Sequence, residues 1–225
     1  GIFALQKGGN AIDAAISAQL AACVSEPLLT GLGGAGIATV RFKKKNQYVD
    51  MFTSTPSEVS ENLQMKTIEI DFGPAKQQFL IGTGSIAVPT LSMGLAKLHE
   101  KYAQLPLELL AQPAISSAKN GISVTSGLAR VLELLWPICQ QSTALQNMMS
   151  RDGIHPLQAG DIFRSELLAA DIHEFSKTGK DFLVTGKYGS GIEELLKEQG
   201  SLKLKDIEDY PISIKKAQHL RYHNA

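Results

Sequence analysis

The sequence has few residues of the kinds that build metal or redox sites. It contains only two cysteines, Cys23 and Cys139, and neither has a cysteine partner at the spacing of a zinc site. Nothing in the sequence supports a disulfide between them, and the redox compartment stays open. No pair among the five histidines combines helical metal-ligand spacing with a carboxylate; His219 and His223 are four residues apart, but they lie close to the end of the chain. We therefore predict no metal site and no cofactor.

An excess of charge of one sign and a long apolar run are also missing. The 22 basic residues balance 22 acidic ones, which argues against a general nucleic-acid binder and against strong attraction to anionic membranes. The one dense basic run, residues 43–45, is followed by Asn46 and Gln47 and is predicted to be a solvated hairpin tip. No apolar stretch approaches the roughly 20 residues that cross a bilayer, so we expect no membrane span.

The sequence also lacks a recognisable pair of nucleophile and base. No serine occupies the Gly-x-Ser-x-Gly setting of an α/β-hydrolase nucleophile. Residues 31–36, GLGGAG, match the glycine spacing of a dinucleotide-binding fingerprint. That fingerprint needs a strand before it and a helix after it, whereas the order expected here is the reverse. We therefore reject nucleotide binding; glycines at this place allow the backbone to approach another segment or a ligand closely.

What the sequence does contain, near its start, is a strong helix signal followed by a hairpin. Asn10 is predicted to cap a helix, with Asp13 three residues later as an acidic residue that suits the helix dipole. Residues 11–24 are almost all small or apolar, which predicts a helix that is buried nearly all round. Residues 37–42 and 47–52 have the composition of strands and are predicted to form an antiparallel hairpin.

The rest of the chain is predicted to be mainly helical. Residues 53–78 are polar with little periodicity, and we expect one short helix and one strand there; residues 82–88 are a further strand candidate, ended by Pro89. Apolar spacing and stop signals predict helices at 91–102, 107–120, 125–135, 167–175 and 192–199, and a turn of helix from residue 204. Since no repeat or linker interrupts the pattern, we interpret residues 1–225 as one continuous domain portion of the α+β class, cut at both ends.

The order of the motifs resembles that of the γ-glutamyltranspeptidase family. Residues 7–15, KGGNAIDAA, are similar to the family's KGGNAVDAA helix start, and Glu26-Pro27 with residues 30–36, TGLGGAG, resemble its glycine-rich turn. Further matches follow at family spacing over nearly the whole chain: Val88-Pro89, Lys101-Tyr102 with Leu105-Pro106, Pro113-Ala114-Ile115, Gly160-Asp161, and Asp206 with Tyr210.

The resemblance implies an αββα sandwich of the N-terminal-nucleophile hydrolases, with this chain as its large-subunit part. In that family a precursor cleaves itself, and the new N-terminal threonine of the small subunit supplies the nucleophile and, through its amine, the base. The resemblance therefore implies a catalytic threonine beyond Ala225, no catalytic residue within this chain, and a small subunit from the same precursor as partner. It also implies a periplasmic or secreted location.

One position departs from the family pattern. In the family an arginine of the large-subunit motif DFRE.AP holds the α-carboxylate of the substrate, a task that suits a planar guanidinium. Aligned on Pro56, residues 50–56, DMFTSTP, place Phe52 where that arginine is expected. A phenylalanine cannot pair with a carboxylate, and the nearest basic residues, Arg41 and Lys45, are expected on the far side of the hairpin.

The candidate substrate-binding residues are therefore Phe52, Thr53 and Ser54, the last two through their hydroxyl groups. Three functions stay open. The complete protein cleaves γ-glutamyl amides such as glutathione, by hydrolysis or by transfer to an acceptor amine; or it is an acylase-like or amidase-like relative with altered acyl specificity; or it is an inactive family member used for binding. The alternative interpretation of Phe52 is a core residue in a shifted register.

Overall fold

The structure is a computed structural model that describes residues 1–196 and 200–218. It contains both helices and strands, as the α+β prediction requires. The helices are α1 (Ile2–Gln6), α2 (Ala11–Ser25), α3 (Leu91–Tyr102), α4 (Leu107–Asn120), α5 (Ser126–Cys139), α6 (Thr143–Met148), α7 (Glu166–Thr178), α8 (Gly186–Leu196) and α9 (Leu204–Glu208), with 3-10 turns η1 (Thr83–Ser85) and η2 (Gly179–Asp181). The strands are β1 (Gly36–Phe42), β2 (Lys45–Met51), β3 (Lys66–Asp71), β4 (Lys76–Ile81), β5 (Ile122–Ser123), β6 (Ile162–Phe163) and β7 (Ser213–Lys216).

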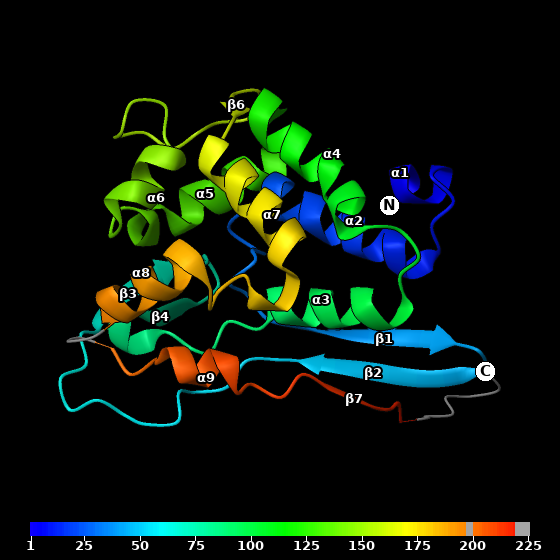
Figure 1. The fold of residues 1–225 in the computed structure, drawn as a ribbon. Helices are drawn as coiled ribbons and strands as arrows, with labels where there is room; N and C mark the ends of the chain where they lie inside the picture. Colours follow the sequence, from blue (N-terminus) through cyan, green and yellow to red (C-terminus); the bar gives the residue numbers. More distant parts are fainter. Residues whose placement is uncertain (197–199, 219–225) are drawn as a thin grey trace.

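The main sheet is antiparallel, with the strand order β1-β2-β7. Figure 1 shows α3 lying along one face of this sheet, with α2, α4 and α7 stacked beyond it. The side chains of β1 and β2 that face α3, among them Val40, Val49 and Met51, are buried, whereas Ile37 on the opposite face is 62% exposed. Among the described residues, no helix covers that opposite face (Figure 1). The sheet therefore has one packed face and one open face.

The predicted hairpin of residues 37–52 is confirmed. The register joins Gly36 to Met51 at one end and Phe42 to Lys45 at the other, so only Lys43 and Lys44 form the turn. Both residues have positive φ, 46° and 63°, which suits the right-handed twist of a two-residue hairpin turn. The basic run is thus a hairpin tip, as predicted, although Lys45 belongs to β2.

The prediction for α2 is confirmed at its start and corrected along its length. Asn10 and Asp13 form a reciprocal capping box. Ile16, Leu20 and Val24 are fully buried, but Ala11, Ala15 and Ala18 are exposed, so the helix is not buried nearly all round. Alanine is compatible with either environment because its side chain has little apolar area to protect and a high helix propensity.

The predictions for residues 53–88 are partly wrong. Instead of one helix and one strand, this region holds the antiparallel hairpin β3–β4, in which Ile68 and Ile70 are buried and alternate with exposed polar residues. Residues 82–88 are not a strand: Gly82 has a φ of 114° and leads into η1. A β-carbon on Gly82 would lie 2.5 Å from the carbonyl oxygen of Gln64, so both this close approach and the positive φ require glycine where the chain turns.

Most of the later helices agree with prediction except at their ends, whereas α6 was not predicted. α3 and α4 match their predicted bounds, α5 runs on to Cys139, and α7 begins at Glu166. α8 begins at Gly186, and the last residues of the helix predicted at 192–199 lie outside the described part, as do His219 and His223. Cys23 and Cys139 are buried free thiols, and burial raises the pKa of each. No helix in the described ranges combines the length and apolarity needed to cross a membrane.

Candidate functional site

The segment that carries Phe52, Thr53 and Ser54 leaves the end of β2 at a crowded junction. Met51, the last residue of β2, is buried, and its carbonyl accepts a hydrogen bond of 2.5 Å from the hydroxyl of Thr90. A β-carbon on Gly94 would lie 2.5 Å from Cβ of Met51, so α3 packs on β2 only because residue 94 is a glycine. The end of the strand is therefore held against the start of α3.

The glycine-rich turn of residues 31–36 closes the same junction. The carbonyl of Gly34 accepts hydrogen bonds of 2.9 and 2.8 Å from the backbone N–H groups of Thr90 and Leu91. These are donors at the start of α3 that have no partner within the helix. The turn lies after α2 and before β1, which confirms the helix–turn–strand order on which nucleotide binding was rejected. The carbonyl of Gly34 thereby holds the start of the helix that supports β2.

Phe52 is exposed at this junction. Its side chain is 57% accessible to solvent, and its carbonyl accepts a hydrogen bond from the hydroxyl of Tyr210. Phe52 is therefore not a core residue of the described chain. Its backbone is anchored while its ring is free, which is the arrangement expected of a residue that contacts another molecule.

The hydroxyl groups of Thr53 and Ser54 both donate hydrogen bonds to backbone carbonyls of this chain. The Thr53 hydroxyl donates to the carbonyl of Val88 at 2.7 Å, and the Ser54 hydroxyl donates to the carbonyl of Thr55 at 3.1 Å. The Ser54 carbonyl in turn accepts from the N–H of Val88 at 2.9 Å. Each hydroxyl has only one proton to give. Thr53 thus ties the segment to the residues before α3, and exposed Ser54 is the easier of the two to redirect toward a ligand.

The charges near Phe52 include one that sequence reasoning missed. Arg41 and Lys45 lie toward the hairpin tip, away from Phe52, as expected. Lys215 of β7, however, lies 3.2 Å from the carboxylate of Asp50, two residues before Phe52. The hydrogen bond to Asp50 raises the pKa of Lys215. Because β7 is short and mostly polar, no local sequence pattern predicted that Lys215 would lie beside Asp50.

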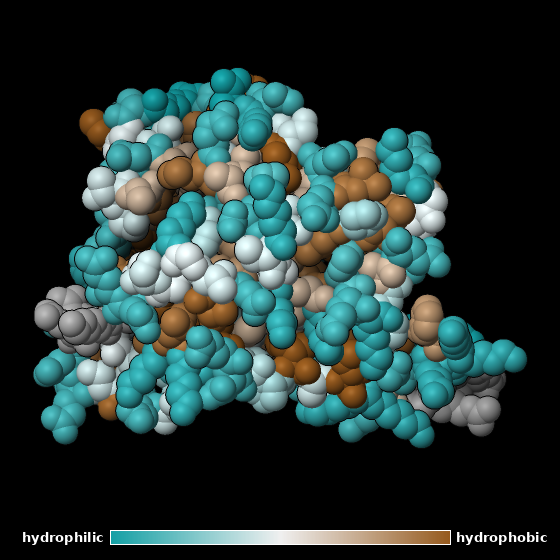
Figure 2. Space-filling model, viewed as in Figure 1, coloured by the Kyte–Doolittle hydropathy of each residue, from teal (hydrophilic) through white to brown (hydrophobic). Residues whose placement is uncertain are grey.

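A groove lies beside the junction. Its volume is about 900 Å³, and it is bounded by α3, η2 and residues 207–212. The lining combines apolar side chains, such as Met93 and Ile207, with charged ones, such as Lys97 and Glu208. Tyr210 lines this groove and also bonds to Phe52. Figure 2 shows mostly hydrophilic side chains over this face of the molecule, with hydrophobic ones exposed at the lower centre, between the levels of α3 and β7.

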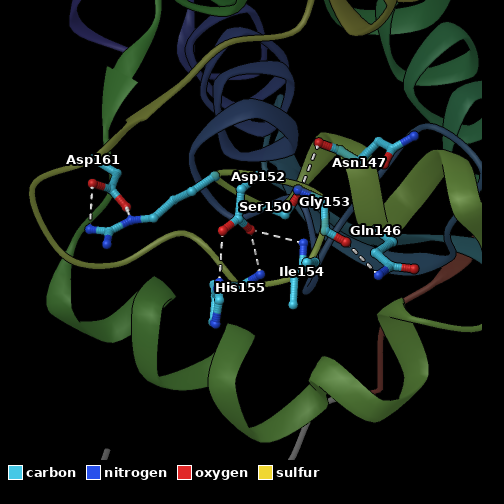
Figure 3. Close-up of polar contacts among 9 residues, drawn as sticks. Gln146, Asn147, Ser150, Asp152, Gly153, Ile154, His155 and Asp161 are labelled. Carbon is cyan, nitrogen blue, oxygen red and sulfur yellow. Dashed lines mark hydrogen bonds and ion pairs between the residues drawn. The ribbon is translucent and has the colours of Figure 1, made fainter.

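A second polar cluster lies far along the chain, in the loop between α6 and β6. The guanidinium of Arg151 donates two hydrogen bonds to the carboxylate of Asp161, with N–O distances of 2.5 and 2.8 Å. Beside it, Asp152 accepts hydrogen bonds from the N–H groups of Ile154 and His155 and lies 2.7 Å from the His155 ring (Figure 3). No group of three His, Cys, Asp or Glu residues in the described chain is arranged to hold a metal ion. This cluster is a loop brace built from local hydrogen bonds.

The brace should weaken in acid. Hydrogen bonds from His155 and Ile154 lower the pKa of Asp152, and those from Arg151 and Gln158 lower the pKa of Asp161, each from an ordinary value of 3.8. Folding therefore gains stability from both carboxylates above that value, and the gain is lost as pH falls through the lower folded-state pKa values. Carbon-13 NMR titration of the two carboxyl groups should give midpoints below 3.8. In Asp152→Asn only the Asp161 transition should remain; a midpoint of 3.8 or above for either group would contradict the brace.

Comparison with known proteins places the chain in a family. The family model described as Gamma-glutamyltranspeptidase matches residues 1–225. A glutathione hydrolase proenzyme of Bacillus subtilis (strain 168) is 28% identical over 221 residues, which cover 95% of this chain and 36% of the relative. The acylase ACY 1 proenzyme of Pseudomonas sp. (strain SE83) is 27% identical and covers 94% of this chain and 38% of the relative. The chain thus spans little more than a third of the length of these curated relatives.

Solved structures share the fold of this chain. The crystal structure of Helicobacter pylori gamma-glutamyltranspeptidase superposes with a TM-score of 0.85 at 23% identity, over 99% of this chain and 63% of that one. The Bacillus anthracis transpeptidase CapD gives a TM-score of 0.76 at 26% identity, over 99% of this chain and 68% of that one. Because the family model covers every residue from 1 to 225, the chain belongs to the γ-glutamyltranspeptidase family.

Proposed function

We propose that this chain is the large-subunit portion of an amide hydrolase of the γ-glutamyltransferase type, whose nucleophile lies in a small subunit of the same precursor. The observation that carries the proposal is the open side of the main sheet. Ile37 is exposed on the uncovered face, and β1 pairs only with β2 among the described strands. A second sheet packed on this face would complete an αββα sandwich and cover the exposed Phe52. The names of the relatives from B. subtilis and Pseudomonas, both proenzymes, support a precursor.

The chemistry assigned to the small subunit follows from an N-terminal threonine. Its amine accepts the proton of its own hydroxyl as the hydroxyl oxygen bonds to the amide carbonyl carbon. The C–N bond of the amide then breaks, the leaving amine takes the proton, and an ester to the threonine remains. Water, or an acceptor amine, attacks the ester and restores the hydroxyl. The residues of this chain contribute the wall of the acyl pocket in this scheme, not the nucleophile.

The first candidate substrates are γ-glutamyl amides such as glutathione, since glutathione hydrolases are among the relatives. A second candidate, a different acyl group, is favoured by one observation: Phe52 presents an exposed apolar ring where the family motif has an arginine. The relatives also include an acylase, which supports variation in the acyl group. We assign the acyl-facing role to Phe52 and Ser54 and the anchoring of their segment to Thr53. A periplasmic or secreted location is part of the proposal and rests on family resemblance.

The test uses the complete precursor that contains this chain. After purification we expect two subunits on a denaturing gel, with threonine as the first residue of the smaller one. The mature protein should release p-nitroaniline from γ-glutamyl-p-nitroanilide or from 4-aminobutanoyl-p-nitroanilide, which lacks only the α-carboxylate. Faster turnover of the second compound would identify the altered acyl specificity. An uncleaved chain with no activity on either anilide would instead support the binding protein.

A further inference from the structure

Residues 201–215 run antiparallel along the segment that carries Phe52. Five side-chain contacts join the two segments, and their order in one is the reverse of their order in the other. In this order they pair Asp50 with Lys215, Phe52 with Tyr210, Ser57 with Asp206, Glu58 with Lys203, and Ser60 with Ser201. We call residues 201–215 the clamp. Figure 1 shows α9 and β7, which belong to the clamp, beside the chain that follows β2.

The contacts differ in what they do. Near one end β7 continues the sheet, since Asp50 pairs with Ser213 in the β2–β7 ladder. Near the other, the N–H of Ser60 donates to the hydroxyl of Ser201, which is only 8% exposed. Between these two ends, beyond the last pair of the β2–β7 ladder, two side chains of the clamp supply the hydrogen bonds. The Tyr210 hydroxyl donates to the carbonyl of Phe52, and a carboxylate oxygen of Asp206 accepts from the N–H of Ser57 at 3.0 Å. The clamp thus replaces sheet pairing by side-chain hydrogen bonds where residue 52 leaves the strand.

Tyr210 is the contact closest to the candidate acyl pocket. Its ring packs in the groove beside α3, so the hydroxyl position is set by packing as well as by its hydrogen bond. The side chain of Phe52 does not fix its position by packing, because the ring is mostly exposed. The backbone direction of this residue therefore depends on the bond at its carbonyl, on a longer bond of 3.4 Å from its own N–H to the Asp50 carboxylate, and on the neighbouring anchor from Thr53 to Val88. A peptide plane that is free to rotate would swing the attached ring.

We propose that Tyr210 is a positioning residue for acyl-group selectivity: its hydroxyl fixes the peptide of Phe52 and thereby the wall that the acyl group meets. This inference rests on the proposed function. Tyr210 touches no reacting atom; it acts through Phe52. Loss of the hydroxyl should weaken binding of the preferred acyl group in the ground state and the transition state alike, so KM should rise while kcat stays close to its wild-type value.

The experiment compares the mature complete protein with Tyr210→Phe on the two anilides defined above. We expect the ratio of kcat/KM values for the two anilides to change by about 3- to 10-fold, the range set by one neutral hydrogen bond. The change should appear in KM for the preferred anilide. The matched control is Tyr188→Phe, which removes a hydroxyl that donates to Asp171, a residue of α7. The control should leave the ratio within about twofold even where the melting temperature falls.

The outcomes separate the two proposals. If the wild-type protein hydrolyses neither anilide, the proposed function is overturned. If it is active and Tyr210→Phe retains the wild-type ratio, the role of Tyr210 is overturned and the proposed function stands. If Tyr210→Phe does not fold, Tyr210→Met takes its place, because it also removes the hydroxyl that donates to Phe52 while keeping a flexible apolar side chain beside the groove. A wild-type ratio in that variant overturns the inference equally.

Discussion

Replacing Asp13 by alanine is expected to lower the free energy of unfolding by about 3–5 kcal/mol. Asp13 is fully buried, and its carboxylate accepts hydrogen bonds from the N–H groups of Asn10 at 2.7 Å, Gln104 at 3.0 Å and Leu105 at 3.0 Å. It thereby joins the start of α2 to the connection between α3 and α4. Alanine would leave these three part-buried donors without the carboxylate, and a donor without a partner costs up to about 1–3 kcal/mol when it is fully buried. The loss is a large part of the 5–15 kcal/mol that typically separates folded from unfolded protein.

Calorimetry of the complete protein measures this effect as a fall in melting temperature of a few degrees, since the shift per kcal/mol decreases as the unfolding entropy grows with chain length. Asp209→Ala, at an exposed aspartate, is the matched control and should change stability by less than about 0.5 kcal/mol. The melting temperature of Asp13→Asn should lie between those of the two alanine variants. One oxygen acceptor remains, but the new NH2 group faces backbone N–H donors and cannot accept from them. If Asp13→Ala melted within 1 °C of the wild type, the carboxylate would not be the link between these elements.

Replacing Phe52 by arginine is expected to raise the preference for γ-glutamyl-p-nitroanilide over 4-aminobutanoyl-p-nitroanilide by roughly 10- to 100-fold. A guanidinium binds a carboxylate through two parallel hydrogen bonds, and a hydrogen bond to a charged group contributes about 1.5–3 kcal/mol. Each 1.4 kcal/mol corresponds to about a tenfold change in an equilibrium constant. The side chain at residue 52 is 57% exposed, so an arginine there does not disturb the core of this chain. The readout is the ratio of kcat/KM values for the two anilides in the mature protein.

Two controls isolate the position and the charge. Phe52→Leu keeps an apolar side chain and should leave the ratio within about threefold of wild type, because no new donor appears. Val59→Arg adds the same charge at a residue that is 78% exposed and lies seven positions further along the chain. A similar rise in both arginine variants would show a general effect of charge. An unchanged ratio in Phe52→Arg would mean that residue 52 does not face the α-carboxylate.

Much of the helical part of the fold is predictable because its signals are local. The capping residues Asn10 and Asp13 lie three positions apart, and the apolar spacing of α3, α4 and α7 is complete within each helix. The β1–β2 hairpin is equally local, since its strands are joined by two residues. The missed β3–β4 hairpin also carried a local signal, the alternation of Ile68 and Ile70 with polar residues, which the polar composition of the region concealed.

The candidate site was predictable only as a position. Alignment on Pro56 pointed to Phe52, Thr53 and Ser54, but not to the exposure of the Phe52 ring or to the bond from Thr53 to Val88. Asp206 and Tyr210 matched a motif of the family, but nothing in the sequence indicated what their side chains contact. Their partners lie about 150 residues earlier in the chain, at Ser57 and Phe52, and no spacing rule connects segments so far apart.

By itself, the sequence determined the start of α2, the bounds of α3 and α4, the first hairpin, the family and the absence of an arginine at residue 52, because each depends on residues close together or on ordered motifs. Only the tertiary structure decided that β7, a short polar strand, joins β2, and that residues 201–215 clamp the segment of Phe52. The physical reason is that such contacts are made by common polar groups, hydroxyls, carboxylates and peptide N–H groups, whose partners are chosen by the folded path of the chain and not by their neighbours in sequence.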